Sequence, residues 1–198
     1  MASSIRHWMA LAPCGLAAHF SITLSRKVGL GNTKRIVLGD TLLRDFTPDE
    51  IAGVVAHELG HQVHGDIWRL IAMGGTMGFG GAWLLAKIAP QTIAAVSEVT
   101  GVTEIGDEAS YPTLAIVGTG LGFLAAPLQA AISRWMERRA DRYAIGLTRD
   151  PVAYAQAMER LAATALADPD PPRPVVIMLY SHPPIAERIR AARATTIA

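Results

Sequence analysis

The sequence predicts a mainly α-helical, membrane-embedded protein with a small β element and a two-helix transmembrane hairpin. Residues 67–89 and residues 111–133 are long apolar stretches, each close to the length that crosses a bilayer. Residues 47–64 carry a helix start signal followed by apolar residues at helical spacing. We therefore expect one capped helix outside the bilayer and two apolar helices within it.

Composition sets limits on the class of protein. The 198 residues suffice for one modest domain, which we place at residues 25–198. A formal net charge of +1 gives no basic footprint, so we expect no nucleic-acid partner. Hydrophobic residues make up 51% and the mean hydropathy is +0.27, both high for a soluble domain. The single Cys14 excludes an intrachain disulfide framework and any cysteine-rich metal site.

Residues 1–24 begin with the basic Arg6 and continue as an apolar stretch. Pro13, Gly15 and His19 interrupt this stretch, so it is marginal as a spanning helix. A signal anchor, a membrane-surface helix and a buried core helix all fit the pattern. We favour membrane association.

The short apolar run within residues 34–40 is bounded by Gly39 and Asp40, which suggests a strand. Such a strand could hold an extended substrate by edge pairing, or it could be a purely structural hairpin strand. Both interpretations stay open.

The next helix is predicted at residues 48–64. Thr47 is a good N-cap, Pro48 suits the first helical position, and Glu50 stands where a capping box requires it. Gly60, inside this helix, costs about 1 kcal/mol relative to alanine. A close neighbour packed against Gly60 would explain its presence.

This helix contains H-E-x-x-H at residues 57–61. Positions i and i+4 share a helix face, so His57 and His61 can both bind one zinc ion. Glu58 can then act as general base for a zinc-bound water and later protonate the leaving amine. The pattern also occurs by chance on surface helices. Here it lies on the inward, apolar part of the helix, where burying these groups without a metal would be costly.

The two apolar stretches have the features of packed membrane helices. Gly74-x-x-x-Gly78 is a small-x-x-x-small pattern that allows close helix approach, and Pro127 predicts a kink. The connection at residues 90–110 contains acidic residues and no basic residue, whereas arginines flank the outer ends of both stretches. The positive-inside rule therefore places the capped helix and the C-terminal part in the cytoplasm. The alternative is a buried helical pair in a soluble protein.

A catalytic zinc site needs a third protein ligand. Ile67 stands where metzincins carry a third histidine, and Asp66 is too close along the helix to come round to the metal. Glu137 and Asp141 follow the second apolar stretch and share a helix face. Glu137 can bind zinc, while Asp141 can accept a hydrogen bond from the outer nitrogen of a ligand histidine. Alternatively, both carboxylates only pair with neighbouring arginines on a solvated helix.

Other residues have weaker signals. His64 lies three residues after His61, but we expect a helix-end histidine because its side chain would point off the shared face. Asp150-Pro151 predicts a helix that reaches about Ala167, and residues 168–174 read as a stiff linker. Residues 175–180 could form a strand or a helix, and a final basic helix starts at about Pro184.

These motifs together resemble the integral-membrane zinc metallopeptidases of the CAAX prenyl protease type I and HtpX group. The resemblance covers roughly residues 29–191, including GNTKRIVLGDTLL at residues 31–43 and Ser181-His182-Pro183-Pro184-x-x-x-Arg188. It implies that His57, His61 and Glu137 bind zinc, that Glu58 is the base, and that His182 and Arg188 line the cleft. His182 could donate to the developing oxyanion, or it could be a helix-entry residue before two prolines. Prenyl proteases carry several membrane helices before this part, so the chain resembles a minimal or truncated member.

The expected protein is a zincin-like zinc metalloendopeptidase in a bacterial inner membrane, with its active site on the cytoplasmic side. Its partners would be one zinc ion, membrane-associated polypeptides and the lipid bilayer, with no oligomeric state implied. Processing of CAAX-type proteins and quality control of membrane proteins both fit. The alternatives are a non-catalytic zinc-binding membrane scaffold, an inactive truncated member, or a soluble zincin with a glycine-rich helical core.

Overall fold

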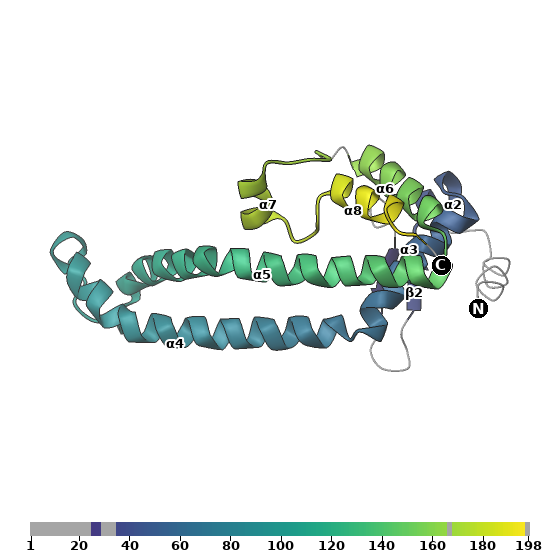
Figure 1. Ribbon diagram of the computed structural model, residues 1–198. Helices are drawn as coiled ribbons and strands as arrows, with labels where there is room; N and C mark the ends of the chain where they lie inside the picture. Colours follow the sequence, from purple (N-terminus) through teal and green to yellow (C-terminus); the bar gives the residue numbers. More distant parts are fainter. Residues whose placement is uncertain (1–24, 29–34, 166–167, 197–198) are drawn as a thin grey trace.

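The computed structural model describes residues 25–28, 35–165 and 168–196, and it is mainly helical (Figure 1). The apolar segment predicted at residues 1–24 lies outside the described residues. Strands β1 (Ser25–Val28) and β2 (Arg35–Leu38) form an antiparallel pair in which Ser25 faces Leu38 and Val28 faces Arg35. The short helix α2 (Asp40–Asp45) follows and buries Leu42.

Helix α3 (Pro48–Val63) has the start that the sequence predicts. The Thr47 side chain accepts a hydrogen bond from the Glu50 N–H, and the Glu50 carboxylate accepts one from the Thr47 N–H at 2.7 Å. This capping box and Pro48 fix the first turn of the helix. The helix ends at His64, and Gly65 adopts a left-handed conformation with φ of 65°, which turns the chain into the next helix.

Two long helices, α4 (Asp66–Thr100) and α5 (Tyr111–Thr148), run side by side away from the rest of the chain (Figure 1). The 3₁₀ turn η2 (Glu108–Ser110) leads into α5. Both helices are longer than the predicted spans, because α4 continues through Pro90 to Thr100 and α5 continues beyond residue 133 to Thr148. Helix α5 therefore joins the second apolar stretch to Glu137 and Asp141 without interruption.

Large apolar side chains on this hairpin are exposed. Phe79 and Trp83 on α4 and Leu124 on α5 are 83%, 64% and 76% exposed. Among the described residues, Glu108–Thr148 is the one helical segment whose length and hydropathy suit a membrane crossing, and 6% of its most apolar window is buried. Among the described residues these apolar side chains are therefore not buried, and a crossing by both helices stays a prediction.

The close packing expected at Gly74-x-x-x-Gly78 is absent from the described residues. A Cβ atom added at Gly74 or Gly78 would meet nothing within 4 Å. A Cβ atom added at Gly118 of α5 would instead lie 3.7 Å from a side-chain atom of Leu85, an ordinary contact distance. The two helices therefore contact each other through other positions than this motif.

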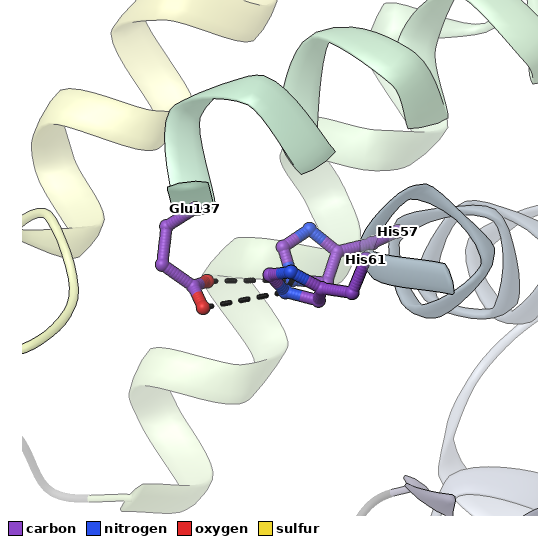
Figure 2. Close-up of side chains that lie close together, drawn as sticks. All are labelled: His57, His61 and Glu137. Atoms are coloured by element: carbon purple, nitrogen blue, oxygen red, sulfur yellow. Dashed lines mark hydrogen bonds and ion pairs between the residues drawn. The ribbon is translucent and has the colours of Figure 1, made fainter. Parts of the chain in front are cut away.

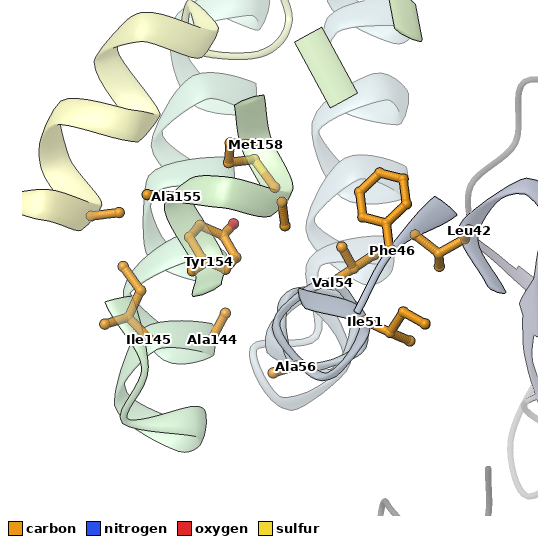
Figure 3. Close-up of a cluster of buried hydrophobic side chains, with 12 residues drawn as sticks. Leu42, Phe46, Ile51, Val54, Ala56, Ala144, Ile145, Tyr154, Ala155 and Met158 are labelled. Atoms are coloured by element: carbon orange, nitrogen blue, oxygen red, sulfur yellow. The ribbon is translucent and has the colours of Figure 1, made fainter. Parts of the chain in front are cut away.

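The C-terminal part packs against α3 and the end of α5. Helices α6 (Pro151–Ala165) and α8 (Ile185–Arg193) pack against each other, and α6 also packs against α3. Residues 175–180, which could have been strand or helix, lie mostly in helix α7 (Arg173–Leu179) on α5. The buried core lies between these elements and includes Leu42, Ile51, Val54, Tyr154 and Met158 (Figure 3).

Candidate metal centre

Helices α3 and α5 approach each other closely at Gly60. A Cβ atom at this position would lie 3.1 Å from Ala140 Cα and 3.3 Å from Tyr143 Cβ. The absence of a side chain at Gly60 therefore allows α3 to rest on the backbone of α5. This is the close neighbour that the sequence analysis expected.

This contact brings His57, His61 and Glu137 together (Figure 2). The Nε2 atoms of the two histidines are 3.2 Å apart, and each lies 3.3–3.4 Å from a carboxylate oxygen of Glu137. Ligands at about 2.0–2.1 Å from a tetrahedral ion lie about 3.3–3.4 Å from one another. The two histidine nitrogens thus have nearly the spacing of neighbouring corners of a tetrahedral zinc site, and the two Glu137 oxygens each approach a different histidine. One candidate ligand atom from each of the three residues lies within 4.8 Å of the others.

The outer side of His57 is held by buried polar groups. Its Nδ1 atom lies 2.9 Å from Asp141 Oδ1, as expected for a carboxylate that orients a metal-binding histidine. Arg188 donates to both Asp141 oxygens, at 2.9 Å and 2.6 Å. The Tyr154 hydroxyl donates to Asp141 Oδ1 at 2.6 Å. Asp141 therefore lies beside His57, as the sequence analysis expected, and Arg188 contacts Asp141; their roles at a metal centre stay predictions.

Tyr154 was missed by the sequence analysis. Its ring is fully buried, and it comes from α6, 97 residues after His57. A tyrosine at an apolar helical position gives no sign of such a contact. Gly53 of α3 gives a weak sign of this contact, because a Cβ atom added there would lie 3.1 Å from the Tyr154 ring.

His61 has a carboxylate of its own, which the sequence analysis also missed. Its Nδ1 atom lies 2.8 Å from Asp66 Oδ2, and Asp66 also pairs with Arg139. Asp66 contacts the nitrogen that faces away from Glu137, so its exclusion as a metal ligand agrees with the structure. Asp66 reaches this outer nitrogen because Gly65, in a left-handed conformation, turns the chain between α3 and α4.

The charges of the site suit a cation. Burial opposes ionisation of Glu137, but the neighbouring imidazoles of His57 and His61 outweigh it and hold the pKa of this carboxyl far below its usual range. Burial likewise opposes ionisation of Asp141, yet His57 and Arg188 lower its pKa to about 2. Both carboxylates are therefore ionised at neutral pH. Two imidazoles and one ionised carboxylate are a donor set that zinc prefers.

The remaining predicted residues lie around this centre. Glu58 follows His57 on α3 and is half-buried. His182 is 61% exposed, and its Nε2 atom lies 3.4 Å from Glu137 Oε1. The His64 Nδ1 atom lies 2.7 Å from the Gly60 carbonyl oxygen, so His64 ends the helix as expected.

Comparison with known proteins agrees with this arrangement. The profile described as peptidase family M48 matches residues 27–196. The uncharacterized metalloprotease YhfN of Bacillus subtilis is 34% identical over 164 residues, which are 83% of this chain and 38% of that protein. Protease HtpX of Cellvibrio japonicus is 32% identical over 77% of this chain and 54% of its own length.

A solved structure has the same fold. The crystal structure of S. mikatae Ste24p superposes with a TM-score of 0.68 at 28% identity, over 85% of this chain and 41% of that chain. The chain thus spans between about two fifths and just over half of these relatives. Because the family profile covers most of the chain, this protein belongs to peptidase family M48.

Proposed function

We propose that this chain is a membrane-associated zinc metalloendopeptidase. The observation that carries the proposal is the cluster formed by His57, His61 and an ionised Glu137 on two packed helices, whose candidate ligand atoms lie within 4.8 Å of one another. Zinc bound there would polarise a scissile carbonyl group and lower the pKa of a water molecule to about 7.

The chain's own residues supply the remaining steps. Glu58 accepts the proton of the attacking water and then delivers it to the leaving amine. Asp141, held by Arg188 and Tyr154, keeps the Nδ1 proton on His57, so that Nε2 presents its lone pair to the metal. His182 stands at the open side of the cluster, where it can donate a hydrogen bond to the substrate carbonyl oxygen.

The hairpin of α4 and α5 would anchor the enzyme in the membrane, with both helices crossing. The exposed apolar side chains of both helices need a nonpolar surrounding. Among the described helices, α5 is the one with the length and hydropathy of a span. Arg69 and Arg134 flank the two apolar stretches at the end that carries the metal centre, while residues 101–110 at the far end are acidic. This asymmetry favours a cytoplasmic active site in a bacterial inner membrane.

Substrates would be membrane-associated polypeptides. The relatives include proteins named HtpX and Ste24p, so we consider both quality control of membrane proteins and processing of CAAX-type proteins.

The test is zinc content measured together with casein cleavage, in detergent, for the wild type, Glu58→Gln and Glu137→Ala. We expect one zinc in the wild type and in Glu58→Gln, cleavage by the wild type alone, and loss of zinc from Glu137→Ala. Zinc retained by Glu137→Ala would overturn the ligand set. Zinc bound without cleavage of casein or of a membrane-protein substrate would favour the non-catalytic scaffold.

A further inference from the structure

Asp66 is a buried carboxylate beside the metal centre. It is 3% exposed and begins α4, immediately after the left-handed Gly65. The turn at Gly65 directs Asp66 back toward the helix that precedes it, and Oδ2 reaches His61 Nδ1 at 2.8 Å. A charge buried to this extent requires partners, because its desolvation is costly.

The other oxygen of Asp66 faces two arginines. Oδ1 pairs with Arg139 of α5, whose side chain is 14% exposed, and it lies 3.3 Å from Arg69 of α4. The Arg139 guanidinium stacks over the Trp135 ring at 4.4 Å, and that of Arg69 lies 5.9 Å from the same ring. Asp66 therefore joins α3, α4 and α5 through one carboxylate.

The two histidines have matching surroundings. His57 donates from Nδ1 to Asp141, which Arg188 holds, and His61 donates from Nδ1 to Asp66, which Arg139 holds. In each pair the carboxylate fixes the proton on Nδ1 and leaves the Nε2 lone pair directed at Glu137 and the metal position. The Asp66 pair differs in one respect, because its carboxylate belongs to the first residue of the apolar hairpin.

We propose that Asp66 is the positioning residue for His61, and that Arg139 keeps Asp66 in place. This inference rests on the proposed zinc site. Asp66 would set the tautomer and the ring orientation of His61, and would thereby fix the metal centre to the base of the membrane hairpin.

The experiment compares Asp66→Asn with the wild type and with Asp40→Asn, a matched change at an exposed aspartate of α2. Zinc affinity is measured by competition with a chromogenic chelator, and the cobalt-substituted proteins are compared by visible absorption. We expect Asp66→Asn to bind zinc about 10- to 100-fold more weakly and to change the cobalt ligand-field bands. Asp40→Asn should match the wild type in both measurements.

A purely structural role would give another result. Asp66→Asn would then unfold at a lower temperature, while its folded fraction would keep wild-type zinc affinity and the wild-type cobalt spectrum, and that result would overturn the proposal. If Asp66→Asn does not fold, the same two measurements are made on Arg139→Lys, which keeps a positive charge beside Asp66 but removes the guanidinium. Weakened zinc binding in Arg139→Lys, with an altered cobalt spectrum, supports the proposal, and unchanged binding and spectrum contradict it. If even the wild type binds no zinc, the proposed function itself fails, a distinct outcome.

Discussion

A Cβ atom at Gly60 would lie 3.1 Å from Ala140 Cα, so these two residues set the distance between α3 and α5. Two of the proposed ligands are on α3 and the third is on α5. The separation of the helices therefore decides whether the three ligand atoms keep the spacing that a zinc ion needs.

Gly60→Ala should destabilise the protein, although alanine is the better helix former. The new methyl group meets backbone atoms that cannot move independently, and such overpacking costs about 1–3 kcal/mol. Gly146→Ala is the control, since Gly146 lies in α5 with nothing within 4 Å, and it should gain up to about 1 kcal/mol. Denaturant unfolding in detergent gives the stability of each variant, and zinc affinity shows whether its metal centre is kept. Equal stabilities for the two variants would show that the contact is not tight.

Tyr154→Phe should weaken the metal centre without emptying it. The change removes a 2.6 Å hydrogen bond to Asp141, worth about 1.5–3 kcal/mol when the acceptor is charged, while Arg188 and His57 stay in place. Burial and the neighbouring Asp141 raise the pKa of Tyr154, so the hydroxyl remains a donor throughout the neutral range. The zinc affinity and the free energy of unfolding should both fall, whereas Tyr111→Phe, at an exposed position, should change neither. If the Tyr154→Phe protein matches the wild type in both measurements, Tyr154 does not contribute to the site.

Glu50→Gln should lose stability in a pH-dependent way. Burial opposes ionisation of Glu50, but hydrogen bonds from the Thr47 N–H and from Arg160 outweigh it and lower the pKa below the usual 4.5. The ionised form therefore stabilises the fold above about pH 4.5, and this contribution disappears as the pH falls through the folded-state pKa.

Glutamine keeps the capping box but not the charge, so we expect a loss of about 1 kcal/mol at pH 7. The difference from the wild type should shrink toward zero in acid, as followed by denaturant unfolding at a series of pH values. A difference that stays constant from pH 7 to pH 3 would contradict the assignment.

Leu124→Lys should loosen membrane association. Leu124 is 76% exposed in the most apolar part of α5, and a lysine near the centre of a span costs about 2.5–3.5 kcal/mol on insertion scales. Val152→Lys is the control, because Val152 is 62% exposed on α6, outside the hairpin. An alkaline wash of membranes should release more of the first variant than of the second. Equal release of both would argue against a bilayer around α5.

The local parts of the site could be predicted from the sequence because their signals are periodic. The capping residues Thr47 and Glu50, the i, i+4 pair His57 and His61, and the helical pair that follows the second apolar stretch all have fixed spacings. The position of Glu137 after the second apolar stretch connected it to the two histidines, and the resemblance to known metallopeptidases implies the same.

The parts that could not be predicted depend on chain reversal or on distant packing. Asp66 reaches His61 only because Gly65 adopts a left-handed conformation, and a single glycine in a sequence does not predict that conformation. Tyr154 reaches Asp141 through the packing of α6, and an apolar pattern predicts burial without naming the partner. No described residue packs closely on Gly74 or Gly78, because a small-residue motif allows a close approach but does not specify which segment approaches.

Helix α5 runs without a break from Tyr111 to Thr148 and carries both the apolar stretch and Glu137. At about 1.5 Å per residue, Glu137 stands about 6 Å along the helix beyond the predicted span that ends at residue 133. In the proposed arrangement this rigid rod holds the scissile bond at a constant height above the lipid headgroups. Cleavage would then be confined to the stretch of a substrate next to the bilayer, and a folded domain further away would have to be drawn down to that level before it could be cut.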